Sequence, residues 1–483
     1  MARQGFELTD NATTQPYGAS QHNYEGYYYM SRRLWDKGIS LDSDVLAFTT
    51  ESDLEHDATL AAYDAVASAA HARMLAGIGI LSEQECLDLL AELHIICQES
   101  VAGTFIITAE LEDCHTAIET RLTAKLGDVG KKIHTGRSRN DQVLVAMRLA
   151  VRHRVLLIME KLFALAKVLI QRARTTTDIA IPGYTHTQKA MPTTASTLML
   201  SYCQYVISLL QDGMGMYRLI NWNPLGVGSG FGVPLHLDRH HTSTLLGFER
   251  EQPNPIFVQS TRGREELKFL TWICDISLLI ERAASDLILF STEEFGFVHL
   301  PEKFTTGSSI MPQKRNPDVL ELLRAQGSLN RASRSELENI MSKLPSSYHR
   351  DYQYTKDSVF KASKRMTGAL KVFASVMNEI IFDKEHAKKM LTPELFSTHY
   401  AYELVSKEQL PFRTAYLKAA EALKAKKIDP QVYIESFLQE EHQRSFMEID
   451  EAYKRIIAGE ELYQRTLQAH YDVCENVFIK TES

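Results

Sequence analysis

Apolar residues recur at helical spacing along several long segments that contain no proline. The clearest is REELKFLTWICDISLLIERAASDLILFSTEEF, Arg264–Phe295, which also lacks glycine. Leu267, Leu270 and Cys274 fall on one line along a helix of 3.6 residues per turn, and a second apolar line runs beside it. The pattern predicts a helix of about 30 residues, about 45 Å long. Its apolar surface is too wide for one partner helix.

Four further proline-free segments show a similar pattern: Val143–Arg174, Thr193–Asn221, Asp318–Lys343 and Asp351–Ile381. A short strand is predicted only for TFIIT, Thr104–Thr108. Five long helices predict an all-α fold built on a long central helical bundle. We expect a mostly helical N-terminal domain with a polar head (1–135), the central bundle (136–382) and a C-terminal helical domain (383–483). Broad apolar faces suggest that bundles merge between subunits of a homo-oligomer.

Composition narrows the class of protein. The chain has 483 residues with a net charge of −8, so a nucleic acid or an anionic membrane is not an expected partner. No run of about 20 apolar residues is present, which predicts no membrane span. The first 30 residues are polar and tyrosine-rich and do not resemble a signal peptide. The six scattered cysteines predict buried free thiols, and we expect a cytoplasmic protein.

Four polar segments lie at helix ends or between helices and carry the candidate chemistry. The first, IHTGRSRNDQV, is Ile133–Val143. It brings Ser138, Arg139 and Asn140 to the start of a long helix, where backbone N–H groups and the helix dipole favour a carboxylate. A capped helix with a solvated basic turn is the alternative interpretation.

The second segment, PGYTHTQKAMP, holds a Thr-His pair between two prolines, Pro182 and Pro192. The prolines fix the backbone on both sides, so we expect a rigid loop that presents Thr185 and His186. A lone histidine is more often structural than catalytic. This segment by itself leaves both interpretations open.

The third segment, GSSIMPQKRNPD, is Gly307–Asp318. Its glycine frees the backbone, its prolines fix it, and it lacks the glycine spacing of a phosphate-binding loop. Lys314 and Asn316 can bind a carboxylate while Ser308 or Ser309 faces a reacting carbon. A basic surface turn is the alternative.

The fourth segment, LPSSYHRDYQYTKD, is Leu344–Asp357. It supplies Tyr348, Gln353 and Lys356, donors suited to another anionic end of a substrate, or else it is a polar turn between helices. Glu321, which follows the third segment on a predicted helix, could orient a histidine. An exposed helical glutamate is the commoner case.

Together, in this order and on a helical background, the segments resemble the fumarase/aspartase superfamily, whose signature loop is Gly-Ser-Ser-x-Met-Pro-x-Lys-x-Asn-Pro. Within it, HTGRSRNDQV, GYTH, GSSIMPQKRNPD and EDCHTAIE (Glu112–Glu119) resemble the argininosuccinate lyase family. PLGVGSGFGVPLHLDR (Pro224–Arg239) follows the frame of that family's Pro-Leu-Gly segment. The resemblance covers the chain from about Asp53 to Phe412. It implies a fumarase/aspartase-like bundle with smaller helical domains at both ends.

The resemblance implies a carbon–nitrogen lyase without a metal or organic cofactor. Such enzymes eliminate an amine from a succinyl group and release fumarate; in this family the products are arginine and fumarate. Removing a proton beside a carboxylate makes a dianionic aci-carboxylate, which preorganised cations and amide donors must stabilise. The resemblance assigns that group to Lys314 and Asn316, and the other carboxylate to Thr185 and Asn140. The remaining expected substrate-binding residues are Ser138, Arg139, Tyr348, Gln353 and Lys356.

By the same resemblance Ser308 is the general base, and Lys314 and loop closure supply the positive field that a serine needs. His186 protonates the departing nitrogen, and Glu321 hydrogen-bonds to it and orients it. The division of the two proton transfers stays open. The resemblance also implies a homotetramer in which three subunits build each active site. The pairs His240-His241 and Asp113/His115 lack a convincing metal-ligand set.

Several departures from the family touch segments that support the site for the amine. RLWDKGIS (33–40) replaces a Leu-Trp-Gly-Gly-Arg-Phe segment, and Asp53 stands where the family has a substrate-contacting serine. STRGREE, Ser260–Glu266, replaces an Asp-Ala-x-Ser-x-Arg-Asp run, while Ser229 and Phe231 replace alanines. The reaction is therefore better defined than the substrate.

Three hypotheses follow. Argininosuccinate cleavage is favoured by the retained fourth segment. A lyase for another N-substituted aspartate, such as an aminopolycarboxylate, is favoured by Asp36, Asp53 and STRGREE. A non-catalytic structural homologue, like the lens crystallins of this family, is disfavoured because the residues for elimination are retained.

Overall fold

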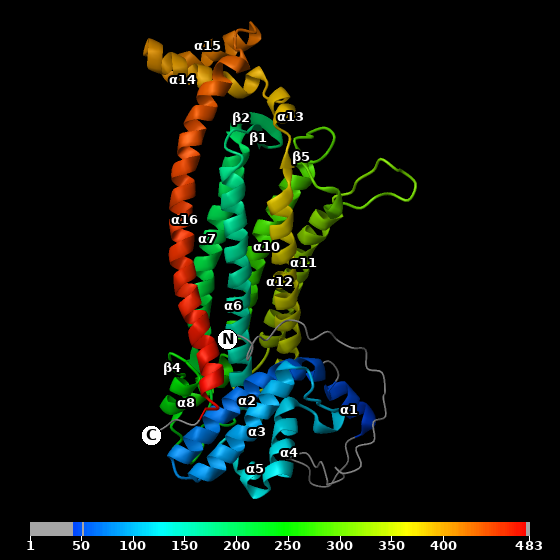
Figure 1. The fold of residues 1–483 in the computed structure, drawn as a ribbon, viewed down its shortest axis with the longest axis vertical. Coiled ribbons are helices and arrows are strands. Elements are labelled where there is room, and N and C mark those ends of the chain that lie inside the picture. The colour runs from blue at the N-terminus through cyan, green and yellow to red at the C-terminus, as the bar shows by residue number, and fades with distance from the viewer. Residues whose placement is uncertain (1–41, 51–52, 480–483) are drawn as a thin grey trace.

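The computed structural model describes residues 42–50 and 53–479 (Figure 1). The tyrosine-rich head and the segment RLWDKGIS lie outside the described residues. The α-helices are α1 (Ser43–Thr50), α2 (Asp53–Gly77), α3 (Glu83–Val101), α4 (Cys114–Leu126), α5 (Asp128–Lys132), α6 (Arg139–Arg174), α7 (Ala195–Ile220), α8 (Arg239–Leu245), α9 (Pro255–Ser260), α10 (Arg264–Phe290), α11 (Asp318–Met341), α12 (Thr355–Glu379), α13 (Lys384–Lys389), α14 (Ser397–Glu408), α15 (Phe412–Lys424) and α16 (Pro430–Asn476).

Strands are few and short in the described part of the chain. They are β1 (Ala180–Thr185), β2 (Gln188–Thr194), β3 (Trp222–Asn223), β4 (Arg250–Glu251), β5 (Val298–His299) and β6 (Ile381–Phe382), and four short 3-10 helices are η1 (Ala109–Leu111), η2 (Glu302–Phe304), η3 (Arg350–Tyr354) and η4 (Pro393–Phe396). The six strands form three two-stranded sheets: β1–β2 and β5–β6 are antiparallel, and β3–β4 is parallel.

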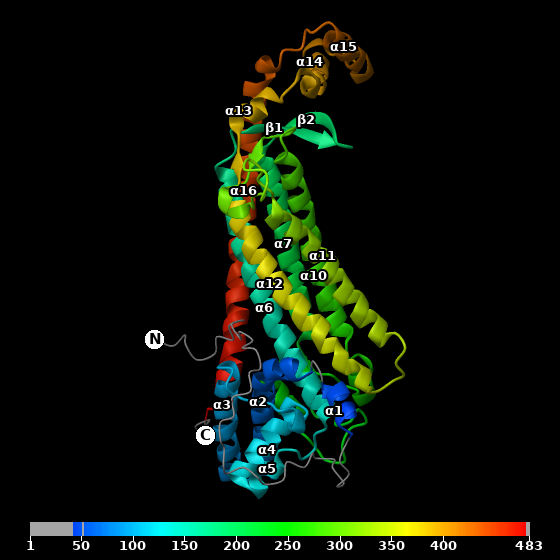
Figure 2. The ribbon, with the colours of Figure 1, turned by 90° about the vertical axis from the view of Figure 1, so that its right-hand side faces the viewer.

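The five predicted long helices are present as α6, α7, α10, α11 and α12, and they run side by side along the long axis of the molecule (Figures 1 and 2). Helix α10 ends at Phe290 rather than at Phe295. Packing is close: a Cβ on Gly213 of α7 would lie 2.8 Å from the Trp272 ring of α10. The predicted all-α bundle is confirmed.

The N-terminal helices α2 to α5 gather at one end of the bundle (Figure 1). Helix α2 is buried over most of its length, since alanines let its neighbours approach on several sides. The predicted strand at Thr104–Thr108 is wrong. Its first two N–H groups bond to the carbonyl oxygen of Glu99 at the end of α3, and no strand lies beside it in the described structure.

The expected rigid loop at 182–192 is instead a β-hairpin, β1–β2, at the opposite end of the bundle (Figures 1 and 2). His186 and Thr187 occupy its two-residue turn with φ of 53° and 58°. Positive φ at both positions is what a tight hairpin turn requires, and for residues other than glycine it costs about 1 kcal/mol or more.

Helix α16 has 47 residues and is about 70 Å long at 1.5 Å per residue. It descends from a small cap formed by α13 to α15 and runs beside α6 and α7 to the N-terminal helices (Figure 1). Ile449, Ile456 and Tyr463 of α16 belong to the main core, whereas the cap has small apolar clusters of its own. The division into three domains at residues 135 and 382 stays a prediction.

The six cysteines are buried and free, as predicted. No helix of the described residues is long and apolar enough to cross a membrane.

Candidate active site

A cavity of about 230 Å³ lies where the N-terminal helices meet the start of α6 and the turn between α11 and α12. It contains Arg139 and Asn140 from the first polar segment and Tyr348, Gln353 and Lys356 from the fourth, although about 200 residues separate the two segments in sequence. Its lining is completed by Thr49, Asp53, Asp57, Glu112, Asp113, His115, Val143, Arg262 and Arg350.

A capping box fixes the cavity end of α6. Ser138 Oγ accepts the N–H of Asn140 at 3.3 Å, and Asp141 Oδ1 accepts the N–H of Ser138 at 2.9 Å. The other oxygen of Asp141 accepts N–H groups of Gly226 at 3.1 Å and Gly228 at 2.8 Å. Burial raises the pKa of Asp141 to about 6 despite these donors. Ser138 therefore caps the helix, and its side chain does not line the cavity.

Lys356 lies between two carboxylates. Its Nζ is 2.8 Å from Asp53 and 2.7 Å from Asp57, and all three side chains are largely buried. Burial and the neighbouring Asp57 raise the pKa of Asp53, against the attraction of Lys356. Burial alone would lower the pKa of Lys356, but the two carboxylates raise it, so this lysine stays charged. Asp53, which stands where the family has a serine, thus adds a second carboxylate beside Lys356.

The other predicted residues of this end are held by a polar network. Arg139 pairs with Glu112 at 3.3 Å and Asp113 at 3.2 Å, and Arg350 pairs with the other oxygen of Glu112 at 3.3 Å. Gln353 Nε2 donates to the carbonyl oxygen of Thr49 at 2.8 Å. These side chains are oriented before any substrate enters.

The STRGREE departure contributes Arg262 to the cavity. Its side chain is 5% exposed, its Nη1 donates to the carbonyl oxygen of Asn140 at 3.0 Å, and its guanidinium lies 4.8 Å from the centre of the Tyr348 ring. Arg262 was not among the predicted site residues, although its segment departs from the family pattern in the sequence. Arg350 and Glu112 were not predicted as site residues either, although they lie in LPSSYHRDYQYTKD and EDCHTAIE, two segments that carry the resemblance or the candidate chemistry.

The remaining predicted residues lie at the other end of the bundle. Thr185 and His186 are exposed at the hairpin turn. Ser308, Lys314 and Asn316 lie in a loop between β5 and α11 that extends from the side of the bundle (Figure 1).

The Ser308 loop is closed at its base by two backbone hydrogen bonds between Thr306 and Asn316, of 3.2 and 2.8 Å. Ser308 Oγ accepts N–H groups of Ile310 at 3.3 Å and Met311 at 3.2 Å. Lys314 is exposed. Glu321 lies exposed on the first turn of α11, and no contact joins it to His186 in the described structure.

Helix lengths show that one chain cannot bring the two groups together. The 36 residues of α6, about 54 Å at 1.5 Å per residue, separate Asn140 from the hairpin that carries His186. The 24 residues of α11, about 36 Å, separate the Ser308 loop from Tyr348. Within one chain, the two groups therefore lie too far apart to contact one small substrate.

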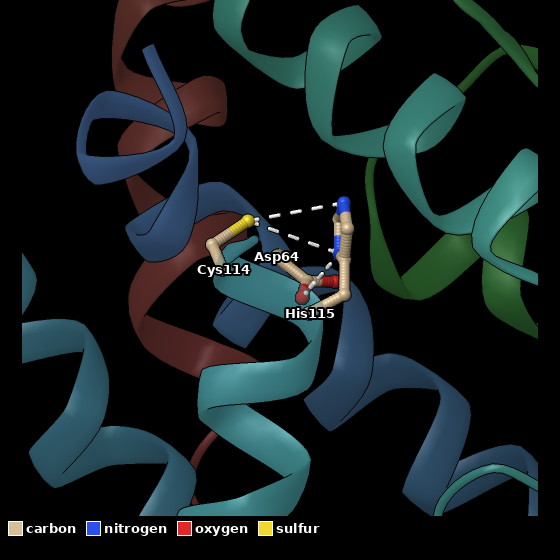
Figure 3. A group of neighbouring side chains, drawn as sticks. All are labelled: Asp64, Cys114 and His115. Carbon is tan, nitrogen blue, oxygen red and sulfur yellow. Dashed lines mark hydrogen bonds and ion pairs between the residues drawn. The ribbon is translucent and has the colours of Figure 1, made fainter. Parts of the chain in front are cut away.

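Asp64, Cys114 and His115 form a buried group (Figure 3), and His115 also lines the cavity. One oxygen, sulfur or nitrogen atom from each of the three side chains lies within 4.8 Å of the others. His115 Nδ1 is 2.8 Å from Asp64, and Cys114 Sγ is 3.8 Å from both ring nitrogens. Burial, together with nearby carboxylates, raises the pKa of the Cys114 thiol, so the thiol stays protonated. The group therefore behaves as a buried His–Asp pair with a thiol neighbour.

The two pairs considered in the sequence as metal ligands have other contacts. Asp113 caps α4 by accepting the N–H of Thr116 at 2.7 Å. His240 is exposed, with its nearest carboxylate, Glu251, at 3.9 Å.

The chain is similar to known lyases over most of its length. A family described as "Lyase" matches residues 39–328. Argininosuccinate lyase of Stenotrophomonas maltophilia (strain K279a) is 42% identical over 392 residues, which is 81% of this chain and 90% of that protein. Argininosuccinate lyase of Sorangium cellulosum (strain So ce56) is 42% identical over 396 residues, 82% of this chain and 92% of that protein.

Solved structures show the same fold at low identity. An EDDS lyase in complex with formate superposes with a TM-score of 0.76 at 20% identity, over 91% of this chain and 95% of the other. Class II fumarase from Schistosoma mansoni superposes with a TM-score of 0.65 at 14% identity, over 79% of this chain and 94% of the other.

These matches define a carbon–nitrogen lyase with the fumarase/aspartase fold. Within that class, the chain belongs to the argininosuccinate lyase family.

Proposed function

We propose that this protein cleaves argininosuccinate to arginine and fumarate, in arginine biosynthesis. The observation that carries the proposal is the 42% identity to argininosuccinate lyases over 81% of the chain. Retention of the expected elimination residues in an exposed loop and an exposed hairpin turn supports it.

The proposed mechanism begins at Ser308, which removes the proton beside the carboxylate. A serine hydroxyl is a weak base, so its anionic form needs stabilisation. The N–H groups of Ile310 and Met311, 3.3 and 3.2 Å from Ser308 Oγ, supply it, because hydrogen bonds to a charged form favour that form. Lys314, which lies further along the same loop, adds a positive charge.

The aci-carboxylate that forms is bound by Lys314 and Asn316, and the other carboxylate by Thr185 and Asn140. The C–N bond then breaks, and His186, oriented in the assembled site by Glu321 of another copy of the chain, gives a proton to the leaving nitrogen. The hairpin turn holds His186 at a positive φ, a strained backbone of the kind that occurs at functional sites.

The site is proposed to be shared by three subunits of a homotetramer. Besides the distance between the two groups, exposed apolar side chains support this: Leu278, Leu322 and Leu329 of α10 and α11 are 46%, 66% and 51% exposed. Because α10 and α11 are packed side by side, exposed leucines on both helices favour a protein interface. A solution mass equal to one chain would refute the shared site.

We also propose a cytoplasmic location. Six buried thiols without a disulfide suit a reducing compartment. Cell fractionation that places the protein in another compartment would contradict this proposal.

A second candidate function is a lyase for another N-substituted aspartate. It is favoured by Asp53 and Arg262, two charged side chains in the cavity at positions where this chain departs from its family. A structure with the same fold is named EDDS lyase, so this fold is not restricted to argininosuccinate lyases.

One experiment tests both functions. Purified protein is mixed with argininosuccinate, and fumarate is followed by ultraviolet absorbance, with arginine measured as the coproduct. Ser308→Ala is the matched inactive control. Fumarate release by wild type alone supports the first function. No release refutes it, and fumarate with a panel of amines then tests the second. If neither argininosuccinate nor the mixtures of fumarate and amines give a product, the hypothesis of a non-catalytic homologue is favoured.

A further inference from the structure

Arg262 differs from the other cations around the cavity in having no carboxylate partner. Arg139, Arg350 and Lys356 each form ion pairs with carboxylates that also line the cavity. In the described part of the chain, no carboxylate oxygen lies within 4.0 Å of the Arg262 guanidinium. The cavity therefore contains a cation available to a ligand.

The guanidinium is held in a fixed plane. It lies 4.8 Å from the centre of the Tyr348 ring and 5.7 Å from that of Tyr352, and Nη1 donates to the backbone carbonyl of Asn140. An arginine has five N–H donors, and the described residues offer no acceptor to the remaining ones. Because the side chain lines the cavity, these donors are available there.

The surroundings do not neutralise Arg262. Arg148 pairs with Glu265 at 2.8 Å, and Glu266 is the carboxylate whose charge favours the charged form of Arg262 by raising its pKa. Burial raises the pKa of Glu266, which favours its neutral form. Burial lowers the pKa of Arg262, yet a guanidinium stays charged in proteins. A buried cation of this kind is most favourable when an anion binds to it.

We propose that Arg262 binds a carboxylate on the amine half of the substrate and selects amines that carry one. The inference rests on the proposed function. Arg262 stacks on Tyr348 and lines the cavity with Gln353. Tyr348 and Gln353 are the residues predicted to bind a second anionic end of the substrate, so the carboxylate bound by Arg262 belongs to the amine half. The planar guanidinium of Arg262, with N–H donors that have no acceptor among the described residues, can bind both oxygens of a carboxylate. Arginine qualifies as such an amine, and so does an aminopolycarboxylate.

The reverse reaction separates this role from a structural one. Fumarate is combined with arginine or with agmatine, which is arginine without its carboxylate, and kcat/KM is measured for each. We expect wild type to prefer arginine by about 100-fold or more, because a buried donor left unpaired disfavours the smaller amine. Arg262→Gln should lose about 100-fold for arginine and change little for agmatine.

Two further variants control for folding. Arg264→Gln removes a half-exposed arginine two residues away that does not line the cavity, and it should keep the arginine preference. If Arg262→Gln alone fails to fold, the double variant Arg262→Gln/Glu266→Gln removes both charges together and takes its place.

The outcomes separate the two claims. An active wild type whose arginine preference persists in Arg262→Gln, or in the double variant, overturns the role of Arg262 alone. A wild type that neither adds arginine to fumarate nor cleaves argininosuccinate overturns the proposed function. The proposal is supported if Arg262→Gln loses the preference for arginine over agmatine while Arg264→Gln keeps it.

Discussion

Two inactive variants should restore activity when their subunits are mixed. Ser308→Ala removes the proposed base in the exposed loop, and Asn140→Ala removes an amide in the cavity at the other end of the bundle. Neither change should unfold the chain, since the Asn140 side chain has one weak contact, 3.5 Å to the carbonyl oxygen of Ser229, and Ser308 lies in a surface loop. The 24 residues of α11, about 36 Å, prevent one chain from supplying both groups to one substrate.

The expected recovery follows from random assembly. If each site takes Ser308 from one subunit and Asn140 from another, equal mixing gives each site both wild-type residues in about one case in four. Activity should therefore reach about 25% of wild type, against about 1% or less for each variant alone. Subunits are mixed under mild denaturation and reassembled, and fumarate release is measured by ultraviolet absorbance.

A matched pair provides the control. Asn140→Ala and Gln353→Ala both alter the cavity of one chain, so every cavity in their mixture lacks one of the two groups and no recovery is expected. The reasoning is refuted if the Ser308/Asn140 mixture is no more active than its parents, or if the control pair recovers equally.

Three further predictions follow from the structure. Ser308→Ala should lower kcat by about 100-fold or more at unchanged melting temperature, and unchanged turnover would remove Ser308 from its assigned role. Burial alone would lower the pKa of His115, but the Asp64 carboxylate outweighs burial and raises this pKa. The ion pair between protonated His115 and Asp64 therefore stabilises the folded state fully below about pH 6.5, the pKa of an unfolded histidine. This stabilisation is lost as pH rises through the folded-state pKa. The melting-temperature difference between wild type and His115→Gln should then shrink from pH 6 to 9; a difference that grows would contradict the ion pair. Burial raises the pKa of Cys203 to about 12, and all six thiols are buried, so a thiol reagent should titrate them only after unfolding; fast labelling of the native protein would contradict the burial.

Helix positions followed from the sequence because their causes are local. Apolar periodicity set the faces of α6, α7, α10, α11 and α12, and prolines and caps set where most of them begin and end. Ser138 and Asp141 form a capping box within four residues, so the start of α6 was visible in the sequence.

The hairpin and the false strand show where local signals were insufficient. The β1–β2 turn has His186 and Thr187 in place of the Asn-Gly pair that usually announces such a turn. TFIIT has the composition of a strand, but no neighbouring strand is available to pair with it. Strands depend on a partner elsewhere in the chain, so sequence composition alone could not decide either case.

The sequence by itself determined the long helices, the class of reaction and the residue types that the reaction needs. Only the tertiary structure decided which of these residues meet. It brought Arg139 and Asn140 to Tyr348, Gln353 and Lys356, added Arg262, and placed Ser308 and His186 a helix length away. The physical reason is that periodicity and capping act over a few residues, whereas a binding site depends on the packing of segments hundreds of residues apart.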